Sequence, residues 1–302
     1  MIPLIVPFHP LLKNELLQVW ESSVLATHDF LLEDDFVSIK KSLTTFDFAS
    51  IDTFCILKGN EMVGFLGIAN QKIEMLFIKS GRMSEGYGTM LMQFAFRHFT
   101  IKYVDVNDQN VAAKLFYTKI GFEPFAHSPR DSMDMSYPIL HFKRVHITLP
   151  ILERECYFVR KMQTSDLDQL VTIWLEASLI AHDFVSPSFW KNQQQAMKEI
   201  YLPQAEVWVI ENSTQIAGFA ALMDNTIAAL FVDPKLQGKG FGSQLMFYIQ
   251  KIYNQLELQV FKKNKKSIDF YVNKGFAIEK TQKNIATEEA EYVMKWKRNS
   301  HF

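Results

Sequence analysis

The sequence repeats itself at a constant offset, and this feature limits the possible folds more than any other. Trp20 and Trp174 are 154 residues apart. The same offset joins Leu25 with Leu179, His28 with His182, Asp29 with Asp183, Phe30 with Phe184, Gly64 with Gly218, Phe77 with Phe231, Gly86 with Gly240, Gly88 with Gly242, and Asn110 with Asn264. Solenoid repeats are only about 20–50 residues long, so this period predicts two copies of one domain.

A seam between the two copies is expected near Val145–Cys156. Pro150 and the charged run Glu153-Arg154-Glu155 are typical of a linker. We therefore predict one domain over residues 1–146 and a second over residues 156–302. Because the linker is short, we expect the two domains to pack against each other within the chain.

Each copy has the pattern of a mixed α/β sheet, in which strands and helices alternate along the chain. Helices are expected through Trp20 and Trp174, and the second helix has a capped start at Thr164, Asp166 and Asp168. Turns are expected at Gly59-Asn60 and Asn212-Ser213. Short apolar runs predict strands at Leu4–Val6, Thr53–Leu57, Val63–Ile68, Tyr157–Arg160, Val207–Ile210, Ile216–Leu222, Ala228–Val232, Leu256–Val260 and Tyr292–Trp296.

A glycine-rich turn follows the Ala228–Val232 strand and opens a helix. Three glycines alternate with other residues in the run Gln237–Gly242. Glycines let a ligand approach the backbone closely, and the unpaired N–H groups of a helix start suit a phosphate. A dinucleotide fingerprint would need glycine where Ser243 stands, and a G-x-x-x-x-G-K-[ST] loop is absent. The alternative is a glycine-rich helix cap without a ligand.

A second motif makes the interpretation more specific. Its residues are Asn264, Ser267, Phe270, Tyr271, Gly275 and Phe276, beginning 22 residues after Gly242. Together the two motifs resemble those of the GNAT superfamily of acyl-CoA-dependent N-acyltransferases, written [QR]-x-x-G-x-[GA] and N-x-x-[AS]-x-x-F-Y-x-x-x-G-F. The constant offset extends this resemblance to almost the whole chain.

The resemblance implies an N-acetyltransferase that moves an acetyl group from acetyl-CoA to a primary amine of a small molecule or peptide. It implies that Tyr271 gives a proton to the departing CoA thiolate; the alternative is a tyrosine of the core. Because adjacent helix residues point about 100° apart, we expect Phe270 in the core and Tyr271 toward the thiol. The acetyl-CoA-binding residues implied for the second copy are Leu230, Phe231, Val232, Gln237, Gly238, Lys239, Gly240, Phe241, Gly242, Ser243, Asn264 and Tyr271.

The first copy keeps only part of this machinery. Met83, Ser84 and Glu85 replace the first three loop residues. The carboxylate would repel a pyrophosphate by roughly 1 kcal/mol at 4 Å in water, and by more where water is excluded. Retained residues that could still bind the cofactor are Gly86, Gly88 and Asn110, and Tyr117 is the corresponding catalytic tyrosine. The first copy is thus either a weaker acyltransferase or a degenerate partner.

The sequence specifies the general base and the acceptor site less closely than it specifies the cofactor site. Glu74 precedes the first loop and is a candidate catalytic base, but its equivalent in the second copy is Ala228. Asp224, His182, Asp183 or a water chain remain for the second copy. The recurring His-Asp-Phe predicts an acceptor-binding loop made of His28, Phe30, His182, Asp183 and Phe184; the alternative is a capping aspartate beside a packed phenylalanine.

Two further groups of side chains have two interpretations each. Lys262, Lys263, Lys265 and Lys266 could meet the phosphates of CoA or form a solvated face. Phe189 and Trp190 could line an acceptor cleft or belong to an aromatic core.

The composition bears on the partners and on the cellular compartment that are expected. The net charge of −1 does not favour nucleic acid. The two cysteines form neither a disulfide framework nor a metal-ligand pattern, and they fit a reducing cytoplasm. No apolar run reaches the roughly 18 residues of a membrane span, and the N-terminus lacks the basic start of a signal peptide. We expect a cytoplasmic enzyme; the alternative is a regulatory protein that binds acyl-CoA without catalysis.

Overall fold

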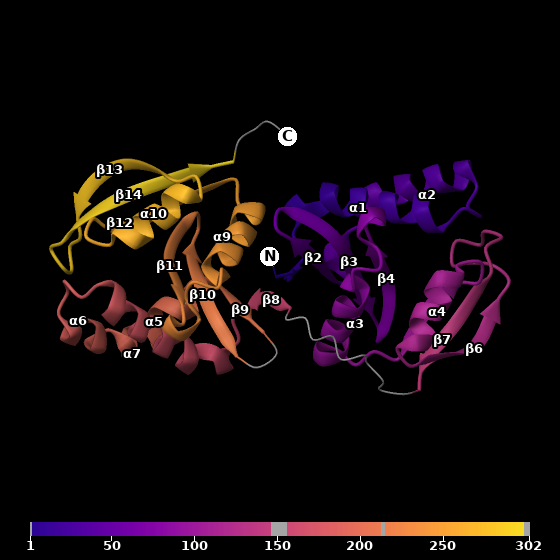
Figure 1. Ribbon diagram of the computed structural model, residues 1–302, viewed down its shortest axis with the longest axis horizontal. Helices are drawn as coiled ribbons and strands as arrows, with labels where there is room; N and C mark the ends of the chain where they lie inside the picture. Colours follow the sequence, from indigo (N-terminus) through magenta and orange to yellow (C-terminus); the bar gives the residue numbers. More distant parts are fainter. Residues whose placement is uncertain (1, 146–155, 213–214, 299–302) are drawn as a thin grey trace. The chain divides into compact units, whose positions relative to one another are not determined.

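The computed structural model describes residues 2–145, 156–212 and 215–298. It divides into two compact units, Met1–Cys156 and Tyr157–Phe302, each containing helices and a sheet (Figure 1). The predicted linker residues Pro150 and Glu153-Arg154-Glu155 lie outside the described part of the chain, as does Ser213 of the second predicted turn.

The first unit is one mixed sheet with helices. Its strands follow the order β1-β2-β3-β4-β5-β7-β6, and β4 runs parallel to β5. The strands are β1 (Leu4–Pro7), β2 (Asp52–Lys58), β3 (Glu61–Ala69), β4 (Lys72–Ile78), β5 (Tyr103–Asn107), β6 (Phe122–Ser128) and β7 (Ile139–Arg144). The helices are η1 (Pro10–Leu12), α1 (Lys13–Thr27), α2 (Glu33–Thr45), η2 (Phe48–Ser50), η3 (Ser80–Arg82), α3 (Tyr87–His98) and α4 (Val111–Lys119).

The second unit repeats this topology. Its strands follow the order β8-β9-β10-β11-β12-β14-β13, and β11 runs parallel to β12. The strands are β8 (Tyr157–Lys161), β9 (Glu206–Glu211), β10 (Ile216–Met223), β11 (Thr226–Val232), β12 (Gln255–Phe261), β13 (Ala277–Lys283) and β14 (Ala290–Lys297). The helices are η4 (Thr164–Asp166), α5 (Leu167–Ala181), α6 (Pro187–Asn192), α7 (Gln194–Ala196), η5 (Met197–Tyr201), α8 (Leu202–Gln204), η6 (Pro234–Leu236), α9 (Phe241–Ile252) and α10 (Lys265–Asn273).

The predicted mixed α/β sheet is confirmed in both copies, and each predicted strand forms. The predicted cap at Thr164 is wrong in detail. The capping residues are Gln163 and Asp166, whose side chains and backbone N–H groups bond reciprocally. Asp166 also receives two bonds from Arg160. None of the helices in the described residues is long and apolar enough to cross a membrane.

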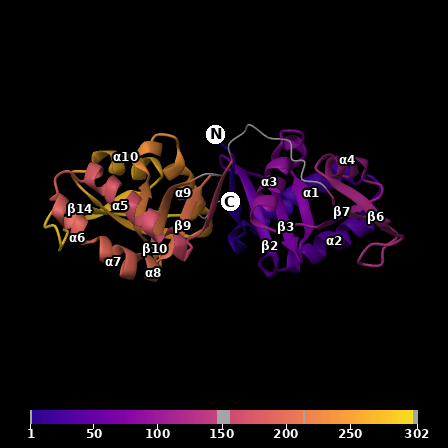
Figure 2. The same ribbon diagram turned by 90° about the horizontal axis from the view of Figure 1, so that it is seen from below.

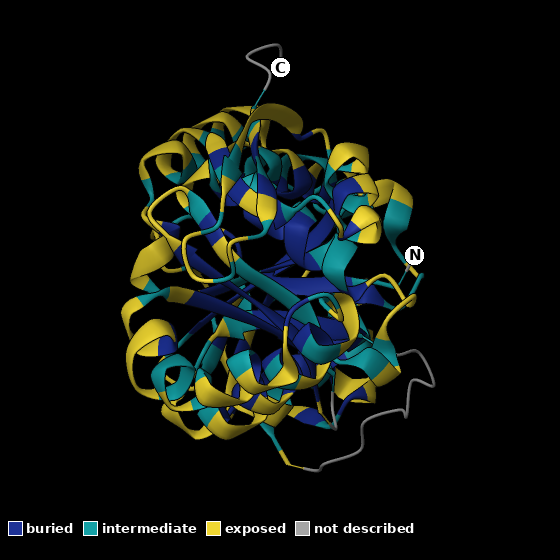
Figure 3. Cartoon of the chain, turned by 90° about the vertical axis from the view of Figure 1, so that its left-hand side faces the viewer, coloured by how far each residue is buried: buried dark blue, intermediate teal, exposed yellow. Residues whose placement is uncertain are grey.

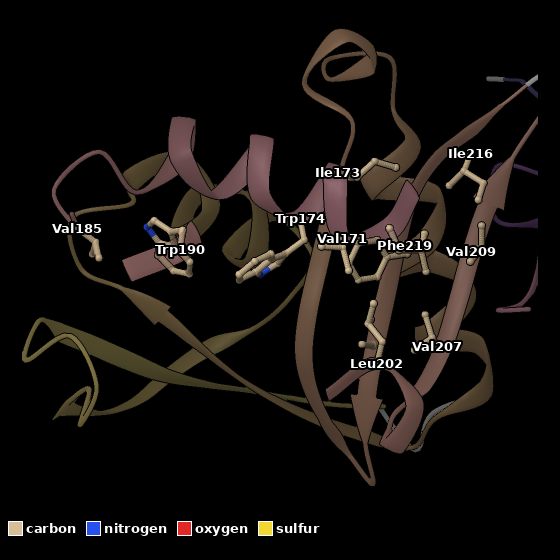
Figure 4. Close-up of a cluster of buried hydrophobic side chains, with 12 residues drawn as sticks. Val171, Ile173, Trp174, Val185, Trp190, Leu202, Val207, Val209, Ile216 and Phe219 are labelled. Atoms are coloured by element: carbon tan, nitrogen blue, oxygen red, sulfur yellow. The ribbon is translucent and has the colours of Figure 1, made fainter. Parts of the chain in front are cut away.

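Helices cover both faces of the second unit's sheet (Figure 2). Trp174 of α5 and Trp190 of α6, with ring centroids 5.8 Å apart, share a buried cluster with Val209 of β9 (Figure 4). The neighbouring Trp208 packs instead against Tyr248 of α9, with centroids 5.0 Å apart. Since successive strand residues point to opposite faces, α5 and α9 lie on opposite sides of the sheet. Figure 3 shows the resulting buried strands beneath helices whose outer surfaces are exposed.

The two parallel strands of each unit separate soon after they begin. β11 and β12 pair only through Thr226 with Glu257 and Ile227 with Leu258. A register shift between β10 and β11 leaves Ala228 without a partner on β10, as in a β-bulge, which bends a strand. β4 and β5 separate in the same way after two pairs. The end of β11 therefore borders a gap that leads to the glycine loop.

Candidate active site

The backbone of β11 presents hydrogen-bonding groups to this gap. The N–H of Asp233 donates to the Ala217 carbonyl at 2.9 Å, which sets the alternation of the antiparallel β10–β11 ladder. Every second residue back from Asp233 faces β10, so the N–H groups of Leu230 and Val232 face the gap. The Val232 carbonyl already accepts a bond of 3.1 Å from the Gln237 side-chain amide. An extended ligand could therefore pair with this strand edge.

The glycine loop leaves its amides open at the start of α9. Gly238 and Gly240 have φ angles of +78° and +92°, which favour glycine. A Cβ at either position would meet no atom within 4 Å. The N–H of Gln244 donates to the Gly240 carbonyl at 3.0 Å, as the first turn of a helix requires. The preceding N–H groups of residues 241–243 and the helix dipole then favour an anion.

These groups line a cavity of about 680 Å³, here called the loop cavity. Lys263, Lys265 and Lys266 line it beside one carboxylate, Asp183, so positive charge prevails. Lys262 lies instead over the Tyr292 ring, 4.8 Å from its centroid. The other predicted site residues that line the loop cavity are Phe184, Leu230, Val232, Gln237, Gly238, Gly240, Phe241, Gly242, Ser243, Asn264 and Tyr271. Lys239 and Phe231, which were predicted to bind the cofactor, are not among its lining residues.

Asn264 links the helix α10 to His182. Its Oδ1 accepts the N–H of Ser267 at 3.1 Å and so caps the helix. This bond orients the amide, and Nδ2 then donates to Nε2 of His182 at 3.3 Å. The imidazole proton therefore belongs on Nδ1, which has no hydrogen-bond partner among the described residues. Burial lowers the pKa of His182 to about 4, so the ring is neutral near pH 7 and a weak base.

His182 also belongs to a second cavity of about 380 Å³, here called the aromatic cavity. Its ring stacks on Trp190 at 5.1 Å and meets the Phe261 ring edge-on at 5.2 Å. Trp174 and Phe189 line the same cavity. Both interpretations of the Phe189-Trp190 pair hold, because Trp190 is buried in the core cluster and also lines the cavity.

The two cavities meet at Tyr271. The residues that line both are Ala181, Leu230, Val232, Gln237, Asn264, Ser267 and Tyr271. Tyr271 is half-buried between Phe270 and Phe276, with centroids 5.2 Å and 5.8 Å away, and burial raises the pKa of its phenol. The expectation that Phe270 packs into the core is wrong. Phe270 is half-buried, lines the loop cavity and lies 3.8 Å from a Cβ placed at Gly242.

Several residues of the aromatic cavity were missed by sequence reasoning. Glu291 of β14 and Asn284 and Thr287 of the β13–β14 loop all line it. No family motif covers these positions. The constant offset could not have found them, because it fails in this segment: Glu291 pairs with Gln282 as Ile139 pairs with the equivalent Ser128, so Glu291 corresponds to Ile139 of the first copy.

Comparison with known proteins agrees with this architecture. A family model described as "Acetyltransferase (GNAT) domain" matches the chain twice, over residues 50–124 and 203–278. The chain belongs to the GNAT acetyltransferase family. GNAT acetyltransferases take their acetyl group from acetyl-CoA, so the protein is an acyltransferase with acetyl-CoA as co-substrate.

Individual relatives correspond in length to one domain of this acetyltransferase. The chain is 32% identical over 139 residues to the peptidyl-lysine N-acetyltransferase YiaC of Escherichia coli, covering 46% of this chain and 95% of that protein. It is 29% identical over 121 residues to the peptidyl-lysine N-acetyltransferase YjaB of Escherichia coli, covering 40% and 82%. The solved apo form of YjaB matches with a TM-score of 0.45 and 28% identity, covering 48% and 99%.

The first GNAT domain keeps the backbone of the loop but not its side chains. Ser84 and Gly86 have φ angles of +62° and +87°, as at the equivalent glycines of the second domain. Glu85 pairs with Lys58 at 3.1 Å and with Arg82 at 3.4 Å. The bond from Lys58 lowers the pKa of the Glu85 carboxyl, so it stays charged and would oppose a bound phosphate.

The other predicted site residues of the first domain have partners within their own unit. Tyr117 is buried, and burial raises its pKa. Asn110 caps α4 through the Ala113 N–H at 3.0 Å. Glu74 lies at the bulge of β4 and pairs with Lys72 at 3.2 Å. A Cβ at Gly88 would lie 3.5 Å from the Phe116 ring, which is an ordinary contact.

The His-Asp-Phe segments follow α1 and α5 in the two domains. The N–H groups of His28 and His182 both donate to the carbonyl four residues earlier, at 2.9 Å, so both histidines end their helices. His28 shares a bond of 2.8 Å with the Thr27 hydroxyl, and Phe30 lies 5.2 Å from its ring. In the described residues Asn110 has no bond to His28, so the histidine–asparagine contact is particular to the second domain.

The remaining base candidates of the second domain are dispersed. Asp224 lies in the β10–β11 turn with a φ of +51° and lines a separate surface pocket with Tyr253. Asp183 is exposed and lines the loop cavity among the lysines. Ala228, at the bulge, offers no acid–base group. The geometry thus places no predicted carboxylate at the aromatic cavity.

Proposed function

We propose that the second domain transfers an acetyl group from acetyl-CoA to a primary amine, with the donor in the loop cavity and the acceptor in the aromatic cavity. One observation carries this proposal. The two cavities share Leu230, Asn264 and Tyr271, so a thioester entering from one side and an amine entering from the other would meet beside a phenol and two free backbone N–H groups.

The donor's parts match the groups of the loop cavity. A diphosphate would accept bonds from the amides of Gly238, Gly240 and the first turn of α9, with Lys265 and Lys266 nearby. The amide-bearing arm of CoA could pair as an extra strand with Leu230 and Val232, whose N–H groups face the gap. That pairing would direct the thioester toward Tyr271.

The chemistry then needs few protein groups. The lone pair of the amine attacks the thioester carbon, a C–N bond forms, and the C–S bond breaks with both electrons going to sulfur. The N–H of Leu230 or Val232 would stabilise the developing oxyanion. Tyr271 would donate its phenol proton to the thiolate, and its raised pKa keeps that proton in place until the thiolate forms. An acceptor that arrives as an ammonium ion first loses a proton to water, because His182, with a pKa of about 4, is a weak base. The proton released from nitrogen after the attack returns through water to the Tyr271 phenolate, so the products are the amide and the free CoA thiol.

The acceptor class rests on the relatives and on the cavity. Two relatives are named peptidyl-lysine N-acetyltransferases. A lysine side chain is a primary amine on a thin apolar stem, which suits the aromatic lining from Trp174, Phe189 and Trp190. We therefore propose a lysine side chain of a peptide as the first acceptor to test, with small alkyl amines second.

We propose a supporting role for the first domain. Its charged loop at Glu85, which Lys58 and Arg82 hold in place, favours weak binding of acetyl-CoA. We also propose that the two domains span residues 1–146 and 156–302 and that they pack against each other. A cytoplasmic location is proposed as well, because Cys55 and Cys156 form no disulfide.

The test uses the full chain with acetyl-CoA and a panel of lysine peptides and small amines. Release of free CoA thiol gives the rate, and mass spectrometry identifies the acetylated product. We expect acetylation of at least one primary amine, together with calorimetric binding of acetyl-CoA. Binding without transfer to any amine in the panel would refute the catalytic part, and no binding would refute the assignment of the loop cavity.

A further inference from the structure

We propose that Glu291 is the acceptor-binding carboxylate of the second domain, and that it selects a charged primary ammonium over an uncharged amine. This inference deepens the proposed function and rests on the aromatic cavity being the acceptor site. Neither sequence motif includes Glu291, and it lies on β14, far along the chain from the glycine loop.

Glu291 is held as a buried carboxylate without a counterion. Only 4% of the residue is exposed, yet it lines the aromatic cavity. Its Oε1 accepts a bond of 2.8 Å from Gln282 Nε2, and its Oε2 accepts one of 3.0 Å from Asn284 Nδ2. No lysine or arginine among the described residues pairs with it. Two neutral donors leave a buried negative charge uncompensated, which is costly unless a cation binds there.

The β13–β14 loop is built to hold this carboxylate. Asn284 Oδ1 accepts the backbone N–H groups of Ala286 and Thr287 at 3.1 Å and 3.0 Å, and it also receives the Thr287 hydroxyl at 3.1 Å. These bonds fix the amide so that Nδ2 points at Glu291. Gln282 is anchored separately, on β13 beside β14, where it is the cross-strand partner of Glu291.

The surroundings of Glu291 favour an organic ammonium ion. Phe261 is its cross-strand partner on β12, so the ring and the carboxylate point to the same face of the sheet. The Phe261 ring in turn meets His182 at 5.2 Å. The only other titratable side chains that line the cavity are His182 and Tyr271, and both are neutral near pH 7 because of their shifted pKa values. One carboxylate among aromatic faces is a suitable site for an alkylammonium group.

The first domain lacks this arrangement. Ile139 stands at the position of Glu291, because Ile139 pairs with Ser128 as Glu291 pairs with the equivalent Gln282. Arg130 stands at the position of Asn284 and donates to the Asp134 carbonyl at 2.6 Å. Just before β7, the Tyr137 hydroxyl donates to Asp35 of α2 at 2.5 Å and accepts the Leu32 N–H at 3.1 Å, so this segment of the first domain is tied to α2. The carboxylate is therefore a property of the second domain alone.

The experiment compares two amines of nearly equal shape. 2-Phenylethylamine is an ammonium ion at pH 7, whereas O-benzylhydroxylamine has the same length and is uncharged. Each is titrated calorimetrically into the full chain saturated with CoA, which carries no acetyl group and allows no turnover. The variants are Glu291→Gln and, as a control of equal charge change, Glu279→Gln, an exposed residue of β13 that pairs with Lys295.

We expect the unmodified chain to bind the ammonium probe at least tenfold more tightly than the uncharged probe. Glu291→Gln should abolish that preference, and Glu279→Gln should keep it. Equal affinity for the two probes, no affinity for the ammonium probe, or a preference that survives in Glu291→Gln would each overturn the proposal. The comparison of probes on the unmodified chain can still refute the proposal if Glu291→Gln fails to fold.

A failure here is separable from a failure of the proposed function. Acetyl-CoA binding and acetyl transfer are measured on the same preparations without either probe. Loss of acetyl transfer with the ammonium preference intact would count against the enzyme mechanism and not against Glu291. Acetyl transfer with no ammonium preference would count against Glu291 alone.

Discussion

Replacement of Tyr271 by phenylalanine tests the proposed proton donor. The change removes one hydroxyl and keeps the ring, so the contacts with Phe270 and Phe276 at 5.2 Å and 5.8 Å remain. No described residue hydrogen-bonds with the Tyr271 hydroxyl. The substitution therefore breaks no bond in the unliganded protein, and we expect the free energy of unfolding to change by less than about 0.5 kcal/mol.

The expected effect on catalysis is much larger. Loss of an acid–base group costs about 10²–10⁴-fold in rate, and a hundredfold loss corresponds to about 2.7 kcal/mol of transition-state stabilisation. We expect the lower end, because water in the open loop cavity can partly replace the phenol. Since burial raises the Tyr271 pKa above its ordinary value near 10, the phenol should stay protonated through neutral and mildly alkaline pH. The rate should therefore show no alkaline loss below about pH 10 from this group.

The assay is the release of CoA thiol under saturating acetyl-CoA and the best amine of the panel, with kcat measured across pH. Tyr117→Phe is the matched control, because Tyr117 occupies the same position in the first domain and its pKa is raised for the same reason. We expect Tyr271→Phe to lower kcat about a hundredfold and Tyr117→Phe to leave it within about twofold. If Tyr271→Phe keeps more than half of the rate, the phenol is not the proton donor.

Three further predictions follow from the same geometry. Gly240→Val should lower acetyl-CoA affinity at least tenfold in calorimetry, because the left-handed backbone and the anion-binding amides are both disturbed. Gly86→Val should lower that affinity less. Equal losses of affinity would contradict the proposal that the second domain is the main binding site. Asn264→Ala should cost about 1 kcal/mol in urea unfolding through the lost cap and should shift the His182 resonances, whereas Asn110→Ala should lose only the cap. The folded pKa of His182, about 4 against an ordinary 6.5, means that the unfolded chain binds more protons between these values. Stability should thus fall as pH drops through that window, by up to roughly 3 kcal/mol, and His182→Gln should flatten the dependence; an unchanged slope would contradict it.

The fold could be predicted largely from the sequence, because its strongest signals are local or repeated. Apolar runs of strand length and glycines at turns depend on residues close in the chain. Because most of the chain repeats at a constant offset, each predicted element is supported by two stretches of sequence. The exception is the helix start at Thr164, where Gln163 and Asp166 form the cap and Arg160 of the preceding strand also pairs with Asp166.

The donor side of the site was predictable for a similar reason. The glycine loop and Asn264 act through backbone groups whose positions follow from their own motifs, and both line the loop cavity. The orientation of side chains was harder to predict from the sequence. The angle between adjacent helix residues separates Phe270 from Tyr271, but it does not say that the core is on the side of Phe270. Both rings lie at cavity walls because the gap between β11 and β12 exposes this face of α10.

The acceptor side could not be derived from the motifs, because its residues come from four separate parts of the chain. His182 ends α5, Trp190 belongs to α6, Phe261 ends β12 and Glu291 begins β14. Pairing of β12 with β14 brings the last two together, and no local pattern encodes that register. Comparison of the two copies nevertheless carries information, since positions that keep the shared fold should agree and positions that serve one domain should differ. Glu291 against Ile139 is such a difference, once the strand register aligns the two domains. A position where one copy keeps a buried, uncompensated charge and the other an apolar side chain is where a substrate site most plainly departs from the requirements of stability.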